Sequence, residues 1–221
     1  PSSRSTMTTR TGSPDPWRAA REGVVALDAG PTAVIRISGP DARRFCNGMF
    51  TNNVRDLPVG GANRSAMVDD RGRVCGFLDL LCDGPDQRIV RPAPLVQFLA
   101  ILDGVDGPAF LARYEKYVVF DDVTLDDLTG TRHTLSFQGP DAAAALVSVG
   151  LDAPRPGTFL APEEGVRVFA RRRSPAGGFD LLVTTADAWR SRVAAVAELV
   201  PDEVAEVLRV AAGRPRFPED T

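Results

Sequence analysis

Two stretches of the sequence, residues 35–45 (IRISGPDARRF) and residues 134–146 (TLSFQGPDAAAAL), repeat one pattern one hundred positions apart. In each stretch a strand-like run leads into a Gly-Pro-Asp-Ala turn, at 39–42 and at 139–142. Alternating apolar and polar residues predict a strand, while proline and aspartate suit the first turn of a following helix. The repeat therefore predicts two copies of one strand–turn–helix unit.

The order of the remaining elements favours an α+β fold. The Asp70-Arg71-Gly72 turn between two alternating runs predicts a hairpin. Further segments are expected as strands at 87–92, 116–128, 165–173 and 178–185, and as helices at 95–114, 185–199 and 201–213. Hairpins mixed with crossovers argue against a doubly wound parallel sheet. We expect two related strand–helix–hairpin halves that arise by internal duplication, pack around a pseudo-twofold axis and leave a cleft between them.

Three segments follow from this reading. Residues 1–20 are polar and are expected to be a disordered tail, or residues added ahead of the native start. Residues 21–130 form the first half of the domain, and residues 131–221 form the second half.

Composition narrows the class of partner. The formal net charge is −3, which provides no general attraction for nucleic acid or an anionic membrane. No apolar run approaches the roughly 20 residues that a membrane span requires. Three cysteines (Cys46, Cys75 and Cys82) without CxxC spacing predict neither a disulfide framework nor a metal site. A cytoplasmic location is therefore expected, with no nucleic-acid or membrane partner.

The usual catalytic signatures are missing, and two charged features stand out instead. The arginine run 171–173 alternates on a strand and is expected to be a solvated edge rather than an anion clamp. Asp180 lies within the apolar strand FDLLV, so its carboxylate either faces solvent or points into a cleft. A buried carboxylate there could accept the paired N–H donors of a 2-amino-4-oxo-pyrimidine ring.

Several stretches, in order, resemble one known family. They are VIRISGPDARRFCNGMFTNNVRDLPVGGANRSAMVDDRGRV, LSFQGPDA, RRRSPAGGFDLLV and LRVAAGRPRFPEDT, and together they run from about residue 24 to the end. This set resembles the glycine-cleavage T-protein superfamily. The resemblance implies the aminomethyltransferase-type folate-binding domain, with tetrahydrofolate or a folate derivative in a central cleft between related halves.

The resemblance is nearer to the YgfZ-like branch, which binds folate and supports iron–sulfur cluster assembly or repair. Gly76 and Phe77 stand where the T-protein has two aspartates, and the nearest carboxylate, Asp79, lies about 7 Å further along the strand. KYVVFDDVTL also resembles the YgfZ-like pattern. The C-terminal barrel and the KGCYxGQE motif of that branch are absent from this sequence.

Transferred residue by residue, the resemblance implies the following folate-binding residues: Asp180, Arg64, Met67, Phe77, Val90 and Arg91. Asp180 would contact the pterin, and Arg64, Arg91 or the 171–173 run would contact the glutamate tail. An arginine of the family, near the start of the last helix, is replaced here by Ala205.

Three functions remain open. The first is a tetrahydrofolate-binding YgfZ-like protein with an iron–sulfur client protein. The second is a folate-dependent aminomethyltransferase, methyltransferase or demethylase, for which Asp79 is the weak catalytic candidate and Asp83 an alternative. The third keeps the fold but loses the pocket and serves protein interaction. Whether the chain is an enzyme stays undecided by the sequence.

Overall fold

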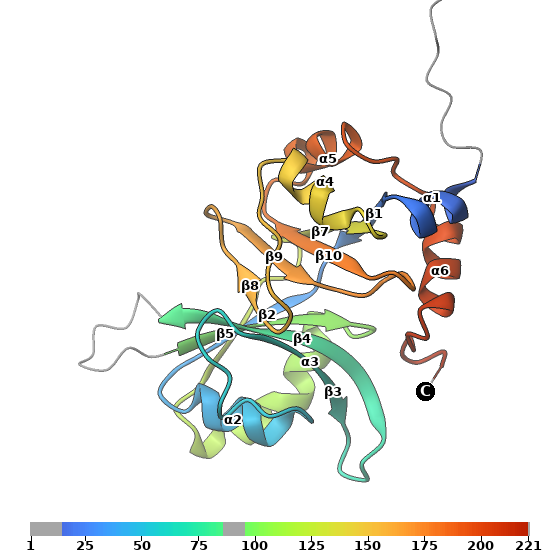
Figure 1. Ribbon diagram of the computed structural model, residues 1–221. Helices are drawn as coiled ribbons and strands as arrows, with labels where there is room; N and C mark the ends of the chain where they lie inside the picture. Colours follow the sequence, from blue (N-terminus) through green and yellow to red (C-terminus); the bar gives the residue numbers. More distant parts are fainter. Residues whose placement is uncertain (1–14, 86–95, 221) are drawn as a thin grey trace, which may run out of the picture.

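The computed structural model describes residues 15–85 and 96–220, which form two stacked antiparallel sheets with helices on their outer faces (Figure 1). The lower sheet has the order β3 (Ala62–Val68), β4 (Val74–Pro85), β5 (Val96–Asp103), β2 (Val34–Ser38) and β6 (Thr124–Asp127). The upper sheet has the order β8 (Phe159–Leu160), β9 (Val166–Ala170), β10 (Gly178–Val183), β7 (His133–Gln138) and β1 (Val25–Pro31). The fold is α+β, as predicted.

The two sheets have equivalent strand orders. β2 and β7, which begin the two copies of the repeat, occupy the same place in their sheets. Each is followed in the chain by a helix and three further strands. The edge strands, however, are exchanged: β1 precedes β2 in the chain but pairs with β7, and β6 precedes β7 but pairs with β2. A division of the chain between η1 and β6 therefore places one strand of each part in the other part's sheet, whereas a division at residue 130 leaves only β1 in the other part's sheet.

The repeated glycines have the same structural cause in both copies. Gly39 and Gly139 have φ values of 121° and 128°, a region that favours glycine. A Cβ at Gly39 would lie 2.2 Å from the Asp122 carbonyl oxygen, and one at Gly139 would lie 2.3 Å from the Gly23 carbonyl oxygen. Each glycine therefore lets the turn contact the backbone that leads into the exchanged edge strand.

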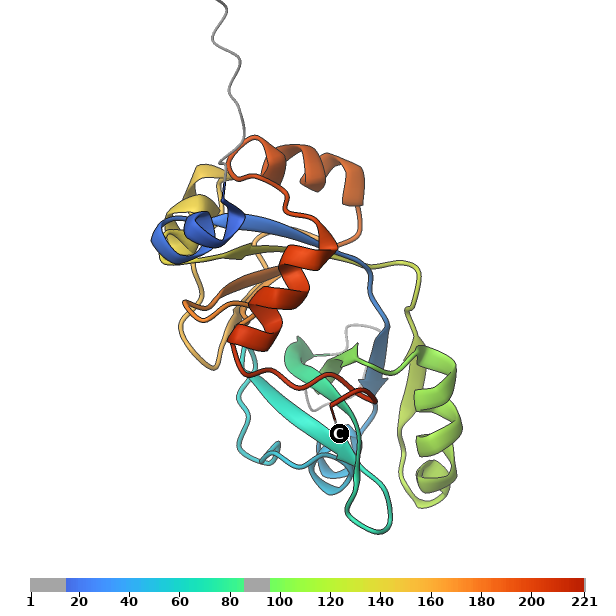
Figure 2. The same ribbon diagram turned by 90° about the vertical axis from the view of Figure 1, so that its right-hand side faces the viewer.

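The helices cover the outer faces of the sheets (Figures 1 and 2). The lower sheet packs against α2 (Ala42–Met49), α3 (Gly107–Tyr114) and the 3-10 helix η1 (Glu115–Phe120). The upper sheet packs against α4 (Ala142–Ser148) and α5 (Ala186–Ala194). At one side of the upper sheet lie α1 (Pro16–Glu22) and α6 (Asp202–Ala211).

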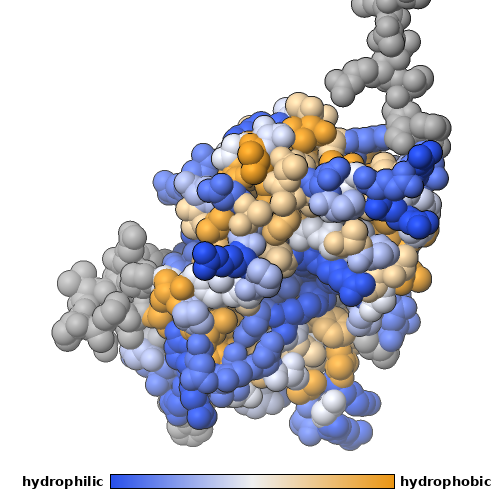
Figure 3. Space-filling model, in the orientation of Figure 1, coloured by the Kyte–Doolittle hydropathy of each residue, from blue (hydrophilic) through white to orange (hydrophobic). Residues whose placement is uncertain are grey.

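The space between the sheets is apolar at one end and charged at the other. The apolar part consists of buried side chains from both sheets: Val34, Leu81, Leu99, Ile101, Phe159, Phe169 and Leu182. Hydrophilic residues line the junction of the two layers on the face shown in Figure 3. Hydrophobic contacts at one end of this space therefore hold the two sheets together, and the other end is available for a polar site.

The structure corrects three element predictions. Residues 96–103, expected to be helical, form β5, and the 3-10 helix at 115–120 replaces an expected strand. A short apolar run such as VQFLAILD is compatible with either a buried strand or a helix, and pairing on both edges decides for the strand. Residues 16–20, assigned to a tail, belong to α1, which Asp15 caps by accepting a hydrogen bond from the Trp17 N–H. The strand expected at 87–92 lies outside the described residues.

Among the described residues, no helix combines the length and apolar character that crossing a bilayer requires.

Candidate functional site

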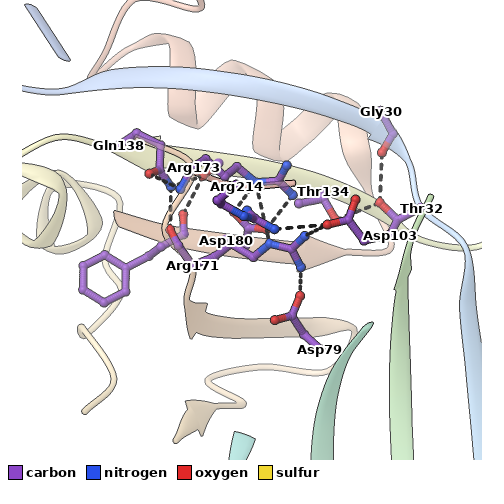
Figure 4. A network of polar contacts seen from close by, with 12 residues as sticks. Gly30, Thr32, Asp79, Asp103, Thr134, Gln138, Arg171, Arg173, Asp180 and Arg214 are labelled. Atoms are coloured by element: carbon purple, nitrogen blue, oxygen red, sulfur yellow. Dashed lines mark hydrogen bonds and ion pairs between the residues drawn. The ribbon is translucent and has the colours of Figure 1, made fainter. Parts of the chain in front are cut away.

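A cluster of charged side chains lies between the two sheets, and Figure 4 shows most of its members. It draws on both sheets and on the segments that follow β9 and α6. We call it the Arg–Asp cluster, and it contains Arg64, Arg171, Arg173, Arg214, Asp79, Asp103 and Asp180. Four arginines against three aspartates leave a formal excess of one positive charge.

Arg171 is the centre of this cluster. Its side chain is only 4% exposed and forms ion pairs with Asp79 and, at 2.7 Å, with the Asp103 carboxylate. The Arg171 Nε is buried without a hydrogen-bond partner and lies 3.7 Å from the Asp180 Oδ2. Burial and the positive charges of the neighbouring arginines lower the pKa of Arg171 well below its usual value. The sequence prediction of a solvated edge is therefore wrong for this residue, because the strand end turns into the interior.

Strand register explains why Arg64 joins the cluster. Arg64 lies opposite Asp79 in the β3–β4 pairing, and Phe77 lies opposite Asp103 in the β4–β5 pairing. The Arg64 guanidinium donates to Asp79 at 3.1 Å and to Asp103 at 2.8 Å, and lies 5.3 Å from the Phe77 ring centroid. Three adjacent strands thus present these side chains on the face that points towards the upper sheet.

Arg214 lies in the segment that follows α6 and reaches the cluster from there. Its Nη2 donates to Asp103 at 3.0 Å, so one carboxylate is shared by three arginines. Burial, followed by repulsion from Arg64, lowers the pKa of Arg214 to about 10. The guanidinium is still charged near neutral pH, and it is held at a point where positive charge is already concentrated.

Asp180 is buried and does not face solvent, which agrees with the second of the two orientations considered for it. Its carboxylate, however, already forms an ion pair with Arg173. The Arg173 Nε lies 2.8 Å from one carboxylate oxygen and Nη2 lies 2.7 Å from the other. Burial raises the pKa of Asp180, but the charge and hydrogen bonds of Arg173, with Arg171 and Ser136, outweigh it and hold the pKa below its usual value. Asp180 is therefore an ionised counter-ion in this structure.

Gln138 holds the arginine run in place. Its Oε1 accepts the backbone N–H groups of Arg173 and Ser174, and its Nε2 donates to the Arg171 carbonyl and to Ser136. The side chain is fully buried with all these groups satisfied. Its place directly before the repeated Gly-Pro-Asp-Ala was the available signal for its role, and sequence reasoning missed it.

Two cavities adjoin the cluster. The arginine cavity, about 380 Å³, lies between the sheets and is lined by Arg64, Phe77, Asp79, Phe169, Arg171, Arg172 and Arg214 among others. The α6 cavity, about 650 Å³, is lined by Asp28, Asp103, Arg173, Asp202, Glu206 and Arg209 among others, and also by Arg214. Arg214 and Pro215 line both cavities and so form part of the wall between them.

The structure brings together only some of the residues assigned by resemblance. Arg64 and Phe77 line the arginine cavity with Asp79, whereas Asp180 lines neither cavity. Met67 is buried on the opposite face of β3, in the core beneath the helices, so its position does not support contact with a ligand between the sheets. Val90 and Arg91 lie outside the described residues.

Two cluster members were not predicted at all. Asp103 follows Leu99 and Ile101 at alternate positions, a signal hidden by reading that segment as a helix. Arg214 lies in a segment without regular structure, where no periodicity marks its direction. Ala205, the position of the lost family arginine, lines the α6 cavity.

The donor set of the arginine cavity can be tested against a folate-type molecule. Arginine side chains pair with carboxylates, and aromatic walls suit a flat ring. The buried Arg171 Nε, which has no hydrogen-bond partner, shows that the aspartates do not use every donor of the cluster. The cavity therefore fits an aromatic, anionic molecule of the folate type.

Comparison with known proteins identifies the family. The GCVT N-terminal domain family matches residues 9–155, more than half of the chain, and the chain belongs to this family. The resemblance to the T-protein superfamily is thereby confirmed.

Three similar proteins illustrate the relationship. A probable aminomethyltransferase of Natronomonas pharaonis is 29% identical over 177 residues, which cover 77% of this chain and 47% of that protein. The trimethylamine-oxide aldolase of Ruegeria pomeroyi is 29% identical over 143 residues, covering 65% of this chain and 17% of that protein. The glycine cleavage system aminomethyltransferase T of Bartonella henselae superposes with a TM-score of 0.76 at 21% identity, covering 89% of this chain and 53% of that chain.

The chain thus spans about half the length of the aminomethyltransferases that it matches. The structural match supports the aminomethyltransferase-type fold, and the family match supports the same domain.

Proposed function

We propose that this chain is a folate-binding domain that holds a tetrahydrofolate-type molecule in the arginine cavity. Family membership and similarity to aminomethyltransferases support the ligand class. The observation that carries the proposal is a cavity between the two sheets whose walls combine arginines with two phenylalanine rings. Small-molecule sites typically join such apolar walls to a few convergent polar groups.

The residues that would hold the ligand follow from this lining. Phe77 and Phe169 offer aromatic contact, while Arg64 and Arg214 offer guanidinium donors for carboxylates. Bound tetrahydrofolate would supply a ring nitrogen able to accept a one-carbon unit. The chain's own residues would bind, orient and neutralise the ligand.

The geometry favours binding over turnover by this chain alone. Gly76 and Phe77 replace the aspartates expected at the hairpin, and the only carboxylate in the arginine cavity, among the described residues, is Asp79. Asp79 is tied to Arg64 and Arg171 in ion pairs and is nearly buried. A carboxylate so engaged serves as a counter-ion, and within the described parts of the chain no second acid lines this cavity for proton transfer.

This argument supports the finer proposal of a YgfZ-like role, in which the folate-bound domain assists iron–sulfur cluster assembly or repair on a client protein. The proposal rests on the missing hairpin aspartates and on KYVVFDDVTL. It predicts that a strain lacking the gene loses activity of iron–sulfur enzymes, and that a plasmid copy restores it. Normal activity of those enzymes in the deletion strain would contradict it.

One-carbon transfer is the second candidate, because the similar proteins include aminomethyltransferases and a trimethylamine-oxide aldolase. It predicts single-turnover formation of methylene-tetrahydrofolate from an aminomethyl donor, with ammonia released and the donor's carrier group left protonated. The binding proposal expects none from this chain.

Calorimetric titration tests the shared claim. We expect saturable binding of (6S)-tetrahydrofolate, weakened about tenfold or more in Arg64→Met, since one charge-assisted contact contributes about 1.5–3 kcal/mol. Arg18→Met is the matched control, because Arg18 is 73% exposed on α1 and distant from the cavity lining. Absence of saturable binding to the wild-type protein at millimolar ligand would refute the proposal.

A further inference from the structure

We propose that a third cavity, which we call the Arg132 cavity, binds a small monocarboxylate with a short aliphatic chain. Its volume of about 200 Å³ is below the roughly 300–1,000 Å³ of sites for drug-sized ligands, so it suits a small molecule. Among the described residues it shares no lining residue with the arginine cavity or the α6 cavity. Its ligand is therefore independent of the folate-type molecule proposed above.

Strand register builds the wall of this cavity from both sheets. Arg36 lies opposite Leu99 in the β2–β5 pairing, and Arg167 lies opposite Leu182 in the β9–β10 pairing. Residues directly opposite each other in an antiparallel pair point to the same face of their sheet. All four residues line the Arg132 cavity, so each sheet presents one guanidinium group and one leucine side chain to it.

Two arginines of the wall are already held by acids. The Arg167 Nε and Nη2 lie 2.6 Å and 2.8 Å from the two oxygens of Asp83, whose side chain is 7% exposed. Asp83 belongs to β4 and Arg167 to β9, so this ion pair joins the two sheets. Arg36 forms an ion pair with Asp126 at 2.7 Å. The wall is therefore ordered before a ligand binds, which lowers the entropic cost of binding.

Arg132, directly before β7, has no acidic partner among the residues that the structure describes. Its Nη1 donates to the carbonyl and hydroxyl oxygens of Thr131, at 3.0 Å and 3.2 Å, while Nε and Nη2 contact no acceptor in the described parts of the chain. Burial and the positive charges of Arg167 and Arg36 lower the pKa of Arg132. A ligand carboxylate would supply the missing counter-ion, and the Nε–Nη2 edge of a guanidinium matches its two oxygens.

The rest of the lining favours one carboxylate with an apolar chain. Glu164 lines the cavity and is exposed, so a second acidic group on the ligand would meet its negative charge. Leu99 and Leu182 are 5% and 1% exposed and would contact an aliphatic chain. Inorganic phosphate has no apolar part that could use this contact, so it is a poorer ligand.

An NMR chemical-shift titration of the full chain tests the ligand class. It would compare butyrate, acetate, succinate, butylamine and inorganic phosphate at constant ionic strength. Butyrate should bind saturably and shift the amide resonances of residues 128–132 and 164–167. Acetate should bind about tenfold more weakly, because it lacks two methylene groups that the leucines would bury. Succinate should also bind more weakly than butyrate, and butylamine should not bind.

Variants locate the site. Arg132→Met should weaken butyrate binding about tenfold or more, since it removes a charge-assisted contact, whereas Arg18→Met on the exposed side of α1 should not. Arg132→Met breaks no ion pair among the described residues, so its urea unfolding should match the wild type and show that the fold is intact. Its affinity for tetrahydrofolate should also be unchanged, because the two cavities share no lining residue.

Three results would overturn the proposal. They are no saturable shift at about 100 mM butyrate, equal butyrate affinity of Arg132→Met and the wild type, and acetate or phosphate binding as tightly as butyrate. Failure of tetrahydrofolate to bind the wild-type protein would instead refute the proposed function and leave the Arg132 cavity untouched.

Discussion

Arg173 contacts both oxygens of the Asp180 carboxylate, with Nε 2.8 Å from Oδ1 and Nη2 2.7 Å from Oδ2. This pair replaces the carboxylate–ligand contact that family resemblance implies for Asp180. The contact is intramolecular and buried, so it has consequences for stability as well as for binding.

Arg173→Ala should destabilise the protein by about 3–5 kcal/mol, because it leaves the buried Asp180 charge unpaired. Arg173→Ala combined with Asp180→Asn should recover part of that loss, since no unpaired charge remains. Urea unfolding of the two variants and the wild type measures both free energies. A double variant less stable than Arg173→Ala would show that the pair does not act as described.

Acid should remove the contribution of the Arg173–Asp180 ion pair to the free energy of unfolding. The pKa of Asp180 is lower in the folded state than the unfolded value of about 3.9, so its contribution is complete above that value and disappears as pH falls through the folded pKa. Asp180→Asn should therefore flatten the fall in unfolding free energy below about pH 5. Equal acid slopes for variant and wild type would contradict the prediction.

Gly39→Ala and Gly139→Ala should each cost more than about 3 kcal/mol, because backbone strain adds to a clash with a carbonyl oxygen. Gly130→Ala is the matched control: its φ is also positive, at 81°, but a Cβ there meets nothing within 4 Å. The control should cost about 1–2 kcal/mol. Thermal or urea unfolding reports all three, and a small effect at only one of the repeated glycines would argue against structural equivalence of the turns.

Asp79→Asn separates the counter-ion role from a catalytic one. Losing the charged partner of Arg64 and Arg171 should lower the unfolding free energy by about 1.5–3 kcal/mol. The affinity of the protein for tetrahydrofolate should not fall, since loss of the Asp79 charge makes the net charge of the arginine cavity more positive by one. Unchanged stability together with loss of a measurable one-carbon transfer would instead support the transferase alternative.

The repeat was the part of the fold that could be predicted best. Gly39 and Gly139 sit in turns that only a small set of backbone conformations can form, so local sequence was sufficient there. β5 could not be recognised, because its apolar residues are buried on both faces and show no strand alternation. The exchange of β1 and β6 depends on pairing between residues that are 86 to 113 positions apart, which no local pattern records.

The part of the site that could be predicted came from the family resemblance. Arg64 and Phe77 were placed on one cavity by the family pattern, and the structure brings them together. The ion pair between Arg173 and Asp180 was not foreseeable, because the six residues between them pass through a turn into β10, and Gln138 from another strand fixes the path of that turn. Charge pairing of this kind depends on tertiary contacts rather than on spacing in the sequence.

The exchanged strands also determine how this molecule can come apart. Cutting the chain between η1 and β6 would leave each fragment with a strand that belongs in its neighbour's sheet, and each sheet with an unprotected edge. Neither fragment is then a self-sufficient folding unit, so unfolding should proceed as one cooperative transition in spite of the internal symmetry.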